Sequence, residues 1–286
     1  MEKLKIVVDS ACDIPQEYLN KYNIKLLPFR IVVDQEEYTD GVDIDKEMLF
    51  QFLAEKRHIT TSQVRAVDFE KTFTECAQKG VKCIYLAFSS KMSGACQTAK
   101  LVAENVREKY PEAVIEVVDT QCGSTAIGLL VDKAIQFKKD NLSIDEIVDK
   151  IKLLSGKLEH IFTLENLERL KTGGRISKTA AFVGELLNIK PILEVKDGKI
   201  NLLKKVRGYN KAYRKIIDIM EERGSNLKDQ LIGISYVGEK EKAEKLIDMI
   251  KDRFGSENFV VNMISNVLTV HLGRSGVGVF FINNEK

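Results

Sequence analysis

The sequence predicts a two-domain α/β protein, with a parallel sheet in the first domain and a mixed sheet in the second. In the first half of the chain, apolar runs alternate with helical patterns, which is typical of βαβ units. In the second half, two strand-like runs flank an Asp-Gly pair, which indicates a hairpin. The length of 286 residues also fits two domains at about 150 residues each. We place the boundary at Ser155-Gly156, which gives domains 1–155 and 156–286.

The first domain is expected to be a three-layer α/β/α unit. Residues 82–88 form a short, nearly continuous apolar run, as expected of a strand that is buried on both faces. Ser143 and Glu146 have the spacing of a capping box, so a helix starts there and ends near residue 154. The same reasoning predicts strands at 5–8, 24–33 (bent at Pro28) and 114–118, helices at 46–55, 67–78, 94–109 and 122–138, and a polar turn through His58 and residues 60–62.

The second domain follows a different pattern. Its hairpin strands are expected at 191–195 and 199–205, and a short helix before them ends at the paired glycines Gly173 and Gly174. Residues 180–189 are too apolar for one simple helix face, which suits either a core helix or the wall of a pocket. Helices at 210–222 and 240–253 and strands at 231–236, 259–263 and 278–282 complete the domain, and the last strand can return to pack near the domain interface.

The composition argues against several classes of protein. The chain carries 44 basic and 42 acidic side chains, a formal net charge of +2, which does not suit a nucleic-acid-coating protein or a polybasic membrane anchor. Its five cysteines form no CxxC pair, and no secretory leader or membrane-spanning run is recognisable, so we expect reduced thiols and a cytoplasmic location. Three scattered histidines do not suggest a metal site. The P-loop, GxSxG, HExxH and GxGxxG motifs are missing.

A serine-rich turn after the strand at 82–88 is the first candidate for a binding site. Ser93 stands where the next helix begins, and the first amides of a helix carry partial positive charge and lack partners within the helix. Gly94 lets a ligand approach the backbone closely. In parallel sheets, ligands bind at the carboxyl ends of the strands, where this turn must lie. The alternative interpretation is that Ser93 only caps its helix.

Two further hydroxyl clusters lie in connecting turns, at 60–63 and 119–124. Helix capping explains each of them alone, but three clusters on one rim would form a site of neutral donors, suited to a carboxylate or phosphate. Arg169, Lys171 and Arg175 form a basic cluster, which suits an anionic head group, an acidic partner or a solvated helix end. His271 precedes a glycine-rich turn, and both a functional and a structural role are open to it. His58 and His160 are expected at the surface or the edge of the core.

Six distinctive stretches are spread over nearly the whole chain. They are Ile6-Val7-Val8-Asp9-Ser10 with Asp13, Thr61-Ser62-Gln63, Ser90-Lys91-Met92-Ser93-Gly94 with Gln97 and Ala99, Val118-Asp119-Thr120, Leu167-Glu168-Arg169-Leu170 through Gly173-Gly174-Arg175-Ile176, and His271-Leu272-Gly273 with Gly276 and Gly278. Together and in this order, they resemble the DegV family of bacterial fatty-acid-binding proteins. Any one of them is unspecific, whereas six in family order are specific.

The resemblance implies a two-domain α/β protein that holds one long-chain fatty acid between its domains, with the acyl chain buried. In the family, hydroxyls at the TSQ and SG turns hold the carboxylate. Carried over to this sequence, those hydroxyls belong to Thr61 and Ser93, with Ser62 and the amide of Gly94 as neighbours. The fatty acid is then the ligand, and no cofactor is implied.

The resemblance also implies a carrier and not a catalyst. The family's arginine in the LERL stretch and its C-terminal histidine match Arg169 and His271, near the mouth of the site. Some members present the lipid to a separate fatty acid kinase of the dihydroxyacetone-kinase type, which makes the acyl phosphate for phospholipid precursor metabolism. Two departures from the family pattern affect the rim: Val64 follows the TSQ turn where proline is frequent, and Arg274 and Ser275 interrupt the usual HxGPG motif.

An enzyme is the alternative function. Ser93 is then the nucleophile of an acyl hydrolase or transferase, which needs a general base within hydrogen-bond reach, and His271 is the plausible one. A regulatory or DNA-binding protein has almost no support, because the charge is balanced and no recognition helix stands out.

Overall fold

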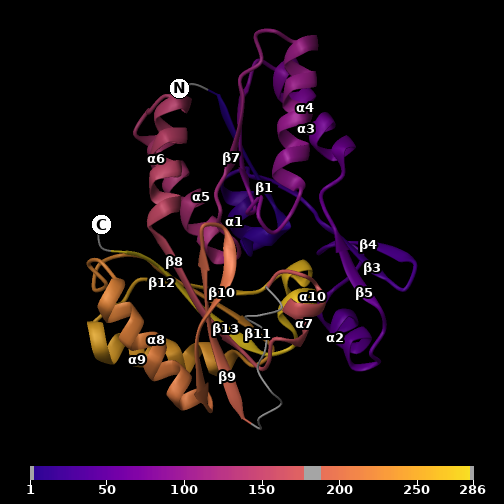
Figure 1. Cartoon of the computed structure of the whole chain (residues 1–286). Coiled ribbons are helices and arrows are strands. Elements are labelled where there is room, and N and C mark those ends of the chain that lie inside the picture. The colour runs from indigo at the N-terminus through magenta and orange to yellow at the C-terminus, as the bar shows by residue number, and fades with distance from the viewer. Residues whose placement is uncertain (1–2, 177–187, 284–286) are drawn as a thin grey trace.

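A four-stranded parallel sheet forms the centre of the N-terminal half (Figure 1). The computed structural model describes residues 3–176 and 188–283. The strand order is β2-β1-β6-β7, and every neighbouring pair is parallel. These strands are β1 (Leu4–Asp9), β2 (Lys25–Leu27), β6 (Lys82–Ala87) and β7 (Ile115–Asp119). All but the first residue of β6 are buried, as its nearly continuous apolar sequence predicts for a central strand.

Helices cover both faces of this sheet and complete the predicted three-layer unit (Figure 1). On one face, α3 (Ala66–Gln78) packs against α4 (Ala95–Lys109). On the other face, α5 (Thr125–Lys139) packs against α6 (Ile144–Lys157), beside the short helix α1 (Gln16–Lys21). The predicted capping box of α6 is present, since Ser143 and Glu146 each accept a hydrogen bond from the other's backbone amide.

A small antiparallel sheet extends from this unit and corrects one prediction. Its strand order is β4-β3-β5, where β4 is Glu36–Thr39, and α2 (Lys46–Ala54) packs beside it. The expected turn at residues 60–62 is wrong, because these residues lie on strand β5 (Ile59–Ser62), which pairs with β3 (Arg30–Val33). The hydroxyl groups suggested a turn, but threonine is β-branched and suits a strand. Neighbouring residues of a strand point to opposite faces, so the side chains of Thr60 and Thr61 diverge.

A six-stranded mixed sheet forms the C-terminal half, as predicted. Its order is β10-β9-β8-β13-β11-β12, and the pair β11 and β12 is parallel whereas the other pairs are antiparallel. The strands are β8 (Leu158–Leu164), β9 (Ile189–Lys196), β10 (Lys199–Arg207), β11 (Ile232–Val237), β12 (Phe259–Met263) and β13 (Gly276–Ile282). Helices α8 (Tyr209–Arg223) and α9 (Lys240–Phe254) pack together on one face of the sheet.

Three elements at the junction of the two halves position the site. Strand β8 follows α6 without a loop, so Ser155 and Gly156, where we placed the boundary, lie in the last turn of α6. The short helix α7 (Glu168–Thr172) ends at Gly173, as predicted. Sequence reasoning missed β8 and the helix α10 (Asn266–Leu272), whose seven residues are too few for a clear helical period. Residues 180–187 of the apolar segment predicted at 180–189 lie outside the part of the chain that the structure describes.

The predicted hairpin joins the two halves at its tip. Asp197 and Gly198 have φ angles of 51° and 74°, the double positive φ of a two-residue type I′ turn. Ser89 Oγ, in the turn after β6, donates a hydrogen bond of 2.7 Å to the carbonyl oxygen of Gly198. A Cβ atom at Gly198 would collide with that hydroxyl. Glycine is therefore required here both by the turn and by the close approach of the two halves.

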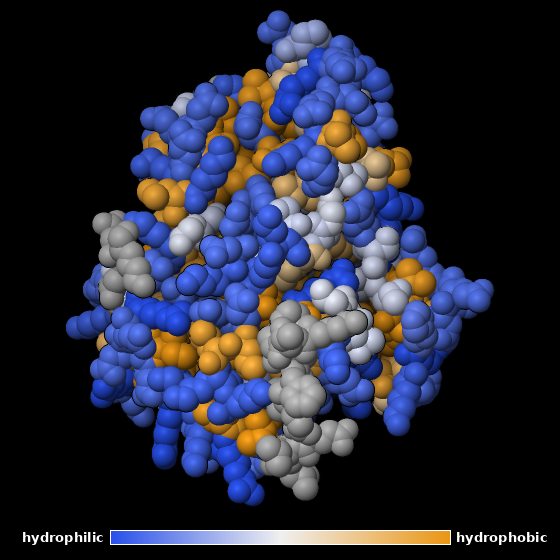
Figure 2. Space-filling view, in the orientation of Figure 1, coloured by the Kyte–Doolittle hydropathy of each residue, from blue (hydrophilic) through white to orange (hydrophobic). Residues whose placement is uncertain are grey.

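Polar side chains cover most of the face of the molecule shown in Figure 2, and apolar side chains appear in smaller patches between them. Within residues 3–176 and 188–283, no helix has the length and apolar character needed to span a bilayer.

A buried carboxylate fixes the carboxyl end of the parallel sheet. Asp9 is fully buried at the end of β1 and accepts hydrogen bonds from the Tyr85 hydroxyl (2.7 Å), the Phe88 amide (2.9 Å) and the Ala11 amide (3.1 Å). These bonds hold the chain where β1 and β6 leave the sheet. Burial dominates over the hydrogen bonds and raises the pKa of Asp9 to about 6.

We expect Asp9→Asn to change how stability depends on pH. The raised pKa means that the folded protein holds a proton on Asp9 between about pH 4 and pH 6, where the unfolded chain has lost it. As the pH rises from about 4 to 6, Asp9 therefore lowers the unfolding free energy of the wild type by about 3 kcal/mol. Urea unfolding of the wild type and of Asp9→Asn at several pH values gives the difference between their unfolding free energies. This difference should change by about 3 kcal/mol between about pH 4 and pH 6. A pH-independent difference would contradict the assignment.

Candidate functional site

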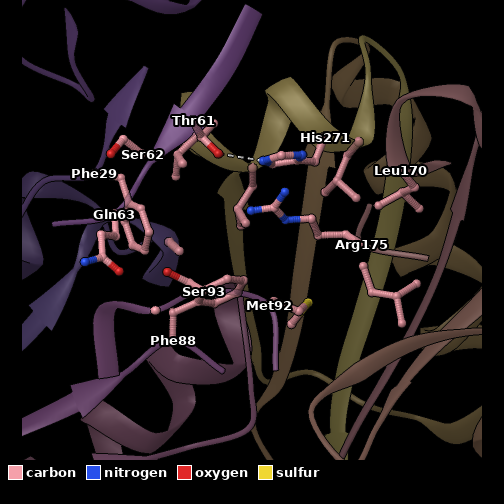
Figure 3. Close-up of a pocket in the computed structure, with 16 residues that line it drawn as sticks. Phe29, Thr61, Ser62, Gln63, Phe88, Met92, Ser93, Leu170, Arg175 and His271 are labelled. Carbon is pink, nitrogen blue, oxygen red and sulfur yellow. Dashed lines mark hydrogen bonds between the residues drawn. The ribbon is translucent and has the colours of Figure 1, made fainter. Parts of the chain in front are cut away.

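A cavity of about 280 Å³ lies where the two halves meet (Figure 3), and we call it the outer cavity. It opens beside the end of β5, the turn between β6 and α4, and the helices α7 and α10. Its polar lining residues come from segments far apart in the sequence. They are Thr61, Ser62, Gln63, Ser93, Gly94, Arg175 and His271.

The turn before α4 contributes Ser93 and Gly94 to the outer cavity. Gly94 occupies the N-cap position and α4 begins at Ala95, whose amide donates a hydrogen bond of 3.2 Å to Ser93 Oγ. Ser93 therefore lies one position before the N-cap and is not the capping residue, and its hydroxyl accepts this one local bond at the edge of the cavity. The atom closest to Gly94 is Gln63 Oε1, and a Cβ atom at Gly94 would collide with it. Gln63 also donates to Thr98 Oγ1 at 2.7 Å, which joins β5 to α4.

A hydrogen bond between Thr61 and His271 crosses the cavity (Figure 3). Thr61 Oγ1 lies 2.8 Å from His271 Nε2, although the two residues are separated by 210 positions in the chain. His271 Nδ1 lies against Gly173, where a Cβ atom would collide with it. The first of the paired glycines therefore lets α7 pack closely against α10, in addition to ending α7.

Two arginines determine the charge of this site. Burial, together with the positive charges of Arg175 and Arg169, lowers the pKa of His271 to about 4, so the ring is neutral at neutral pH. Arg175 lines the cavity, and Figure 3 shows its guanidinium group between the Thr61–His271 pair and Ser93. Arg169 does not line it in this structure, but its side chain lies near Gly273 and its charge acts on His271. Sequence reasoning noticed Arg175 only as part of a basic cluster.

The third hydroxyl cluster does not join this rim. Asp119 accepts hydrogen bonds from the amides of Ser90 and Gln121, both at 3.1 Å. Thr120 Oγ1 donates to the carbonyl oxygen of Ala87 at 2.8 Å, and Ser124 Oγ donates to Asp13. The expectation that three clusters converge is thus wrong for this one, because its side chains are used to hold the turns and strands together.

A second, apolar cavity adjoins the outer one, and we call it the inner chamber. Its volume is about 70 Å³. Five apolar side chains belong to the linings of both cavities, and we call this shared part of the lining the neck: Phe88, Met92, Ile200, Leu268 and Leu272. Beyond this neck the chamber lies on the inner face of the mixed sheet, against Phe162, Leu164, Val195, Val277 and Phe280. The sequence signal for it was weak, because β8 reads LEHIFTL and its residues do not alternate between apolar and polar.

The remaining histidines and the cysteines lie apart from the outer cavity. His58 is exposed, as expected, whereas His160 is only 2% exposed and lines the inner chamber, so its placement at the surface or core edge was wrong. All five cysteines are buried with free thiols. Across the described part of the chain, no three His, Cys, Asp or Glu side chains are grouped so that they could hold a metal ion.

Comparison with known proteins identifies the family. Residues 3–284 match the family model described as "Uncharacterised protein, DegV family". This chain belongs to the DegV family. Among its curated relatives, a DegV domain-containing protein of Clostridium perfringens is 37% identical over 289 aligned residues, which cover 100% of this chain and 99% of the relative.

Solved structures share the fold of this DegV protein. A stearic-acid-binding protein from Eubacterium ventriosum matches with a TM-score of 0.89 and 28% identity, over 99% of this chain and 98% of that one. A DegV family protein from Thermus thermophilus, described for its fatty acid binding, matches with a TM-score of 0.88 and 26% identity, over 99% of this chain and 100% of that one. The two-domain α/β architecture is therefore the architecture of the family.

We expect Arg175→Gln to raise the pKa of His271. Removing the nearby positive charge stabilises the imidazolium form, and Arg175 has a larger effect on this ring than Arg169. The pKa is measured by NMR titration of the His271 ring nitrogens. The expected order is Arg175→Gln above Arg169→Gln above wild type, and Arg207→Gln on the exposed strand β10 serves as the control. If the pKa of His271 is unchanged in Arg175→Gln, the guanidinium group of Arg175 does not lie near His271 in solution.

Proposed function

We propose that this DegV protein binds one long-chain fatty acid between its two domains, 1–155 and 156–286. The observation that supports it best is that a polar outer cavity and an apolar inner chamber adjoin and share the five side chains of the neck. The carboxylate lies in the outer cavity and the acyl chain passes through the neck into the chamber. The residues that contact the head group are Thr61, Ser93, Ser62, Gly94 and His271, whereas Arg169 lies outside this lining and acts through its charge.

The neutral ring of His271 prepares Thr61 for an anion. With its proton on Nε2, the ring donates to Thr61 Oγ1 at 2.8 Å, which leaves the threonine hydroxyl proton free for the carboxylate. Ser93 offers a second hydroxyl from the other side, and Arg175 adds a positive charge between them. Hydrogen bonds to a charged group each contribute about 1.5–3 kcal/mol. The head group is thus oriented by a few directed contacts.

The acyl chain supplies most of the affinity. Burial of about 16 carbons at roughly 0.8 kcal/mol per CH₂ gives on the order of 12 kcal/mol before the entropy of binding is subtracted. The apolar walls of the neck and the chamber provide this environment. The stearic-acid-binding protein from Eubacterium ventriosum shares the fold at 28% identity, which supports a fatty acid as the ligand here.

A carrier role fits the exposure of the head-group site. Ser62 and Gly94 are exposed at the rim of the outer cavity, where a second protein can reach a bound carboxylate. We therefore assign catalysis to a partner, a cytoplasmic fatty acid kinase of the dihydroxyacetone-kinase type that phosphorylates the presented lipid.

The alternative, an acyl hydrolase or transferase with Ser93 as nucleophile, lacks an activated serine. Among the described residues, Ser93 Oγ accepts a hydrogen bond from the Ala95 amide, whereas His271 Nε2 is bonded to Thr61. A nucleophilic serine needs its base within hydrogen-bond reach.

The double variant Thr61→Ala/Ser93→Ala should lose its lipid and remain folded. Removal of two hydrogen bonds to the carboxylate is expected to weaken binding at least about a hundredfold. Native mass spectrometry of protein purified from bacteria measures occupancy, and a thermal melt measures folding. Thr60→Ala is the matched control, because Thr60 neighbours Thr61 on β5 but is exposed. Full lipid occupancy in the double variant would refute the head-group assignment.

Purified protein should hydrolyse a chromogenic acyl ester no faster than its Ser93→Ala variant, because no base in residues 3–176 or 188–283 is hydrogen-bonded to the Ser93 hydroxyl. The measurement is release of the chromophore under saturating ester. Turnover that Ser93→Ala abolishes would favour the enzyme and count against the carrier.

A further inference from the structure

The inner chamber contains one polar atom that the apolar walls do not explain. His160, on β8, is 2% exposed and lines the chamber with its ring edge-on to Phe280, at 5.5 Å between ring centroids. Its Nε2 atom has no hydrogen-bond partner within the described chain. A buried acceptor without a partner is strongly unfavourable and rare in folded proteins.

The hydrogen-bonding state of this ring follows from its other nitrogen. Nδ1 of His160 lies 3.2 Å from the carbonyl oxygen of Leu158. Because a carbonyl oxygen only accepts, Nδ1 carries the ring proton, and Nε2 is left with a free lone pair. Burial lowers the pKa of His160 to about 4, so the ring stays neutral at neutral pH. Nε2 is therefore an acceptor and needs a donor.

The other polar side chains of the chamber have partners. Ser235 Oγ lies 2.9 Å from Ser124 Oγ and 2.6 Å from Thr125 Oγ1, and Ser124 also donates to Asp13. Among the described residues that line the chamber, His160 alone has a buried side-chain atom without a partner. Among the described lining residues, Nε2 of His160 is therefore the one buried side-chain atom that a donor group of the ligand could still pair.

We propose that His160 makes the inner chamber selective for fatty acids that carry a hydroxyl group on the distal half of the acyl chain. The inference rests on the proposed fatty-acid site, since it assumes that the tail occupies the chamber. A hydroxyl at this depth donates to Nε2 of His160, whereas an unsubstituted chain leaves the acceptor unpaired. Sites with a buried polar group discriminate strongly against ligands that cannot pair it.

A hydroxyl beside the carboxylate does not gain from this contact. The head group lies in the outer cavity near Thr61 and Ser93, which do not line the chamber. His160 and Val195 also line a separate polar cleft of about 430 Å³ behind the chamber. A water molecule from that cleft is the competing partner of Nε2, and it would remove any preference for a hydroxylated chain.

The test is a competition between ligands on delipidated protein. Stearic acid is compared with its 2-hydroxy, 12-hydroxy and ω-hydroxy derivatives, by displacement of a fluorescent fatty acid. We expect the 12-hydroxy or the ω-hydroxy acid to bind about fivefold more tightly than stearic acid, and the 2-hydroxy acid to show no such gain. Equal binding of stearic acid and both distal hydroxy acids to the wild type would overturn the inference, and this outcome needs no variant.

The variant His160→Leu should reverse the preference. Leucine fills the space but accepts no hydrogen bond, so the distal hydroxy acid should bind about tenfold more weakly relative to stearic acid than it does in the wild type. Phe162→Leu, two residues along the same face of β8, is the matched control and should weaken all four ligands alike. A preference that persists in His160→Leu would overturn the assignment to this residue. Failure of every ligand to bind the wild type would instead refute the proposed function.

Discussion

A buried carboxylate, that of Asp13, ties the C-terminal half of the chain to the N-terminal half, and the geometry of the site depends on this tie. Asp13 Oδ1 accepts a hydrogen bond of 2.7 Å from the amide of Ser265, immediately before α10, and its other oxygen accepts from Ser124. Lys46 reinforces the contact by donating to Thr269 Oγ1 at 2.9 Å. Since His271 lies on the same short helix, these bonds bring it within reach of Thr61.

The tie uses ionisable groups in an apolar interface. Burial raises the pKa of Asp13 to about 6 and lowers that of Lys46 to about 8, which reflects the price of removing both groups from water. Buried charges of this kind stabilise little compared with apolar packing, but breaking one partner is strongly unfavourable. Their main effect is therefore to fix how the two halves meet, and with it the shape of the cavity between them.

The two adjoining cavities offer different kinds of contact to a ligand. The outer cavity offers hydroxyls, a neutral histidine and a guanidinium group, which are directed contacts suited to an anion. The inner chamber offers apolar area, which favours burial without fixing a direction. The position of His160 in that chamber is the exception, because it introduces a directed contact where the rest of the wall has none.

Much of the fold could be predicted because its signals are local. The buried strand β6, the capping box of α6 and the Asp-Gly turn each depend on residues within a few positions of one another. The seven-residue helix α10 and the strand β8 were missed, since one is too short for a helical period and the other follows α6 without an intervening loop. The strand β5 was taken for a turn because hydroxyl groups occur in both.

The sequence by itself determined the alternation of strands and helices, the family resemblance, and the residue types of the candidate site. Only the tertiary structure decided that His271 pairs with Thr61, that Arg175 and not Arg169 lines the outer cavity, and that His160 lies in the inner chamber. The physical reason is that these contacts join residues far apart in the chain. Their distances are set by the packing of α7, α10 and β8 against the N-terminal half, which no local pattern encodes.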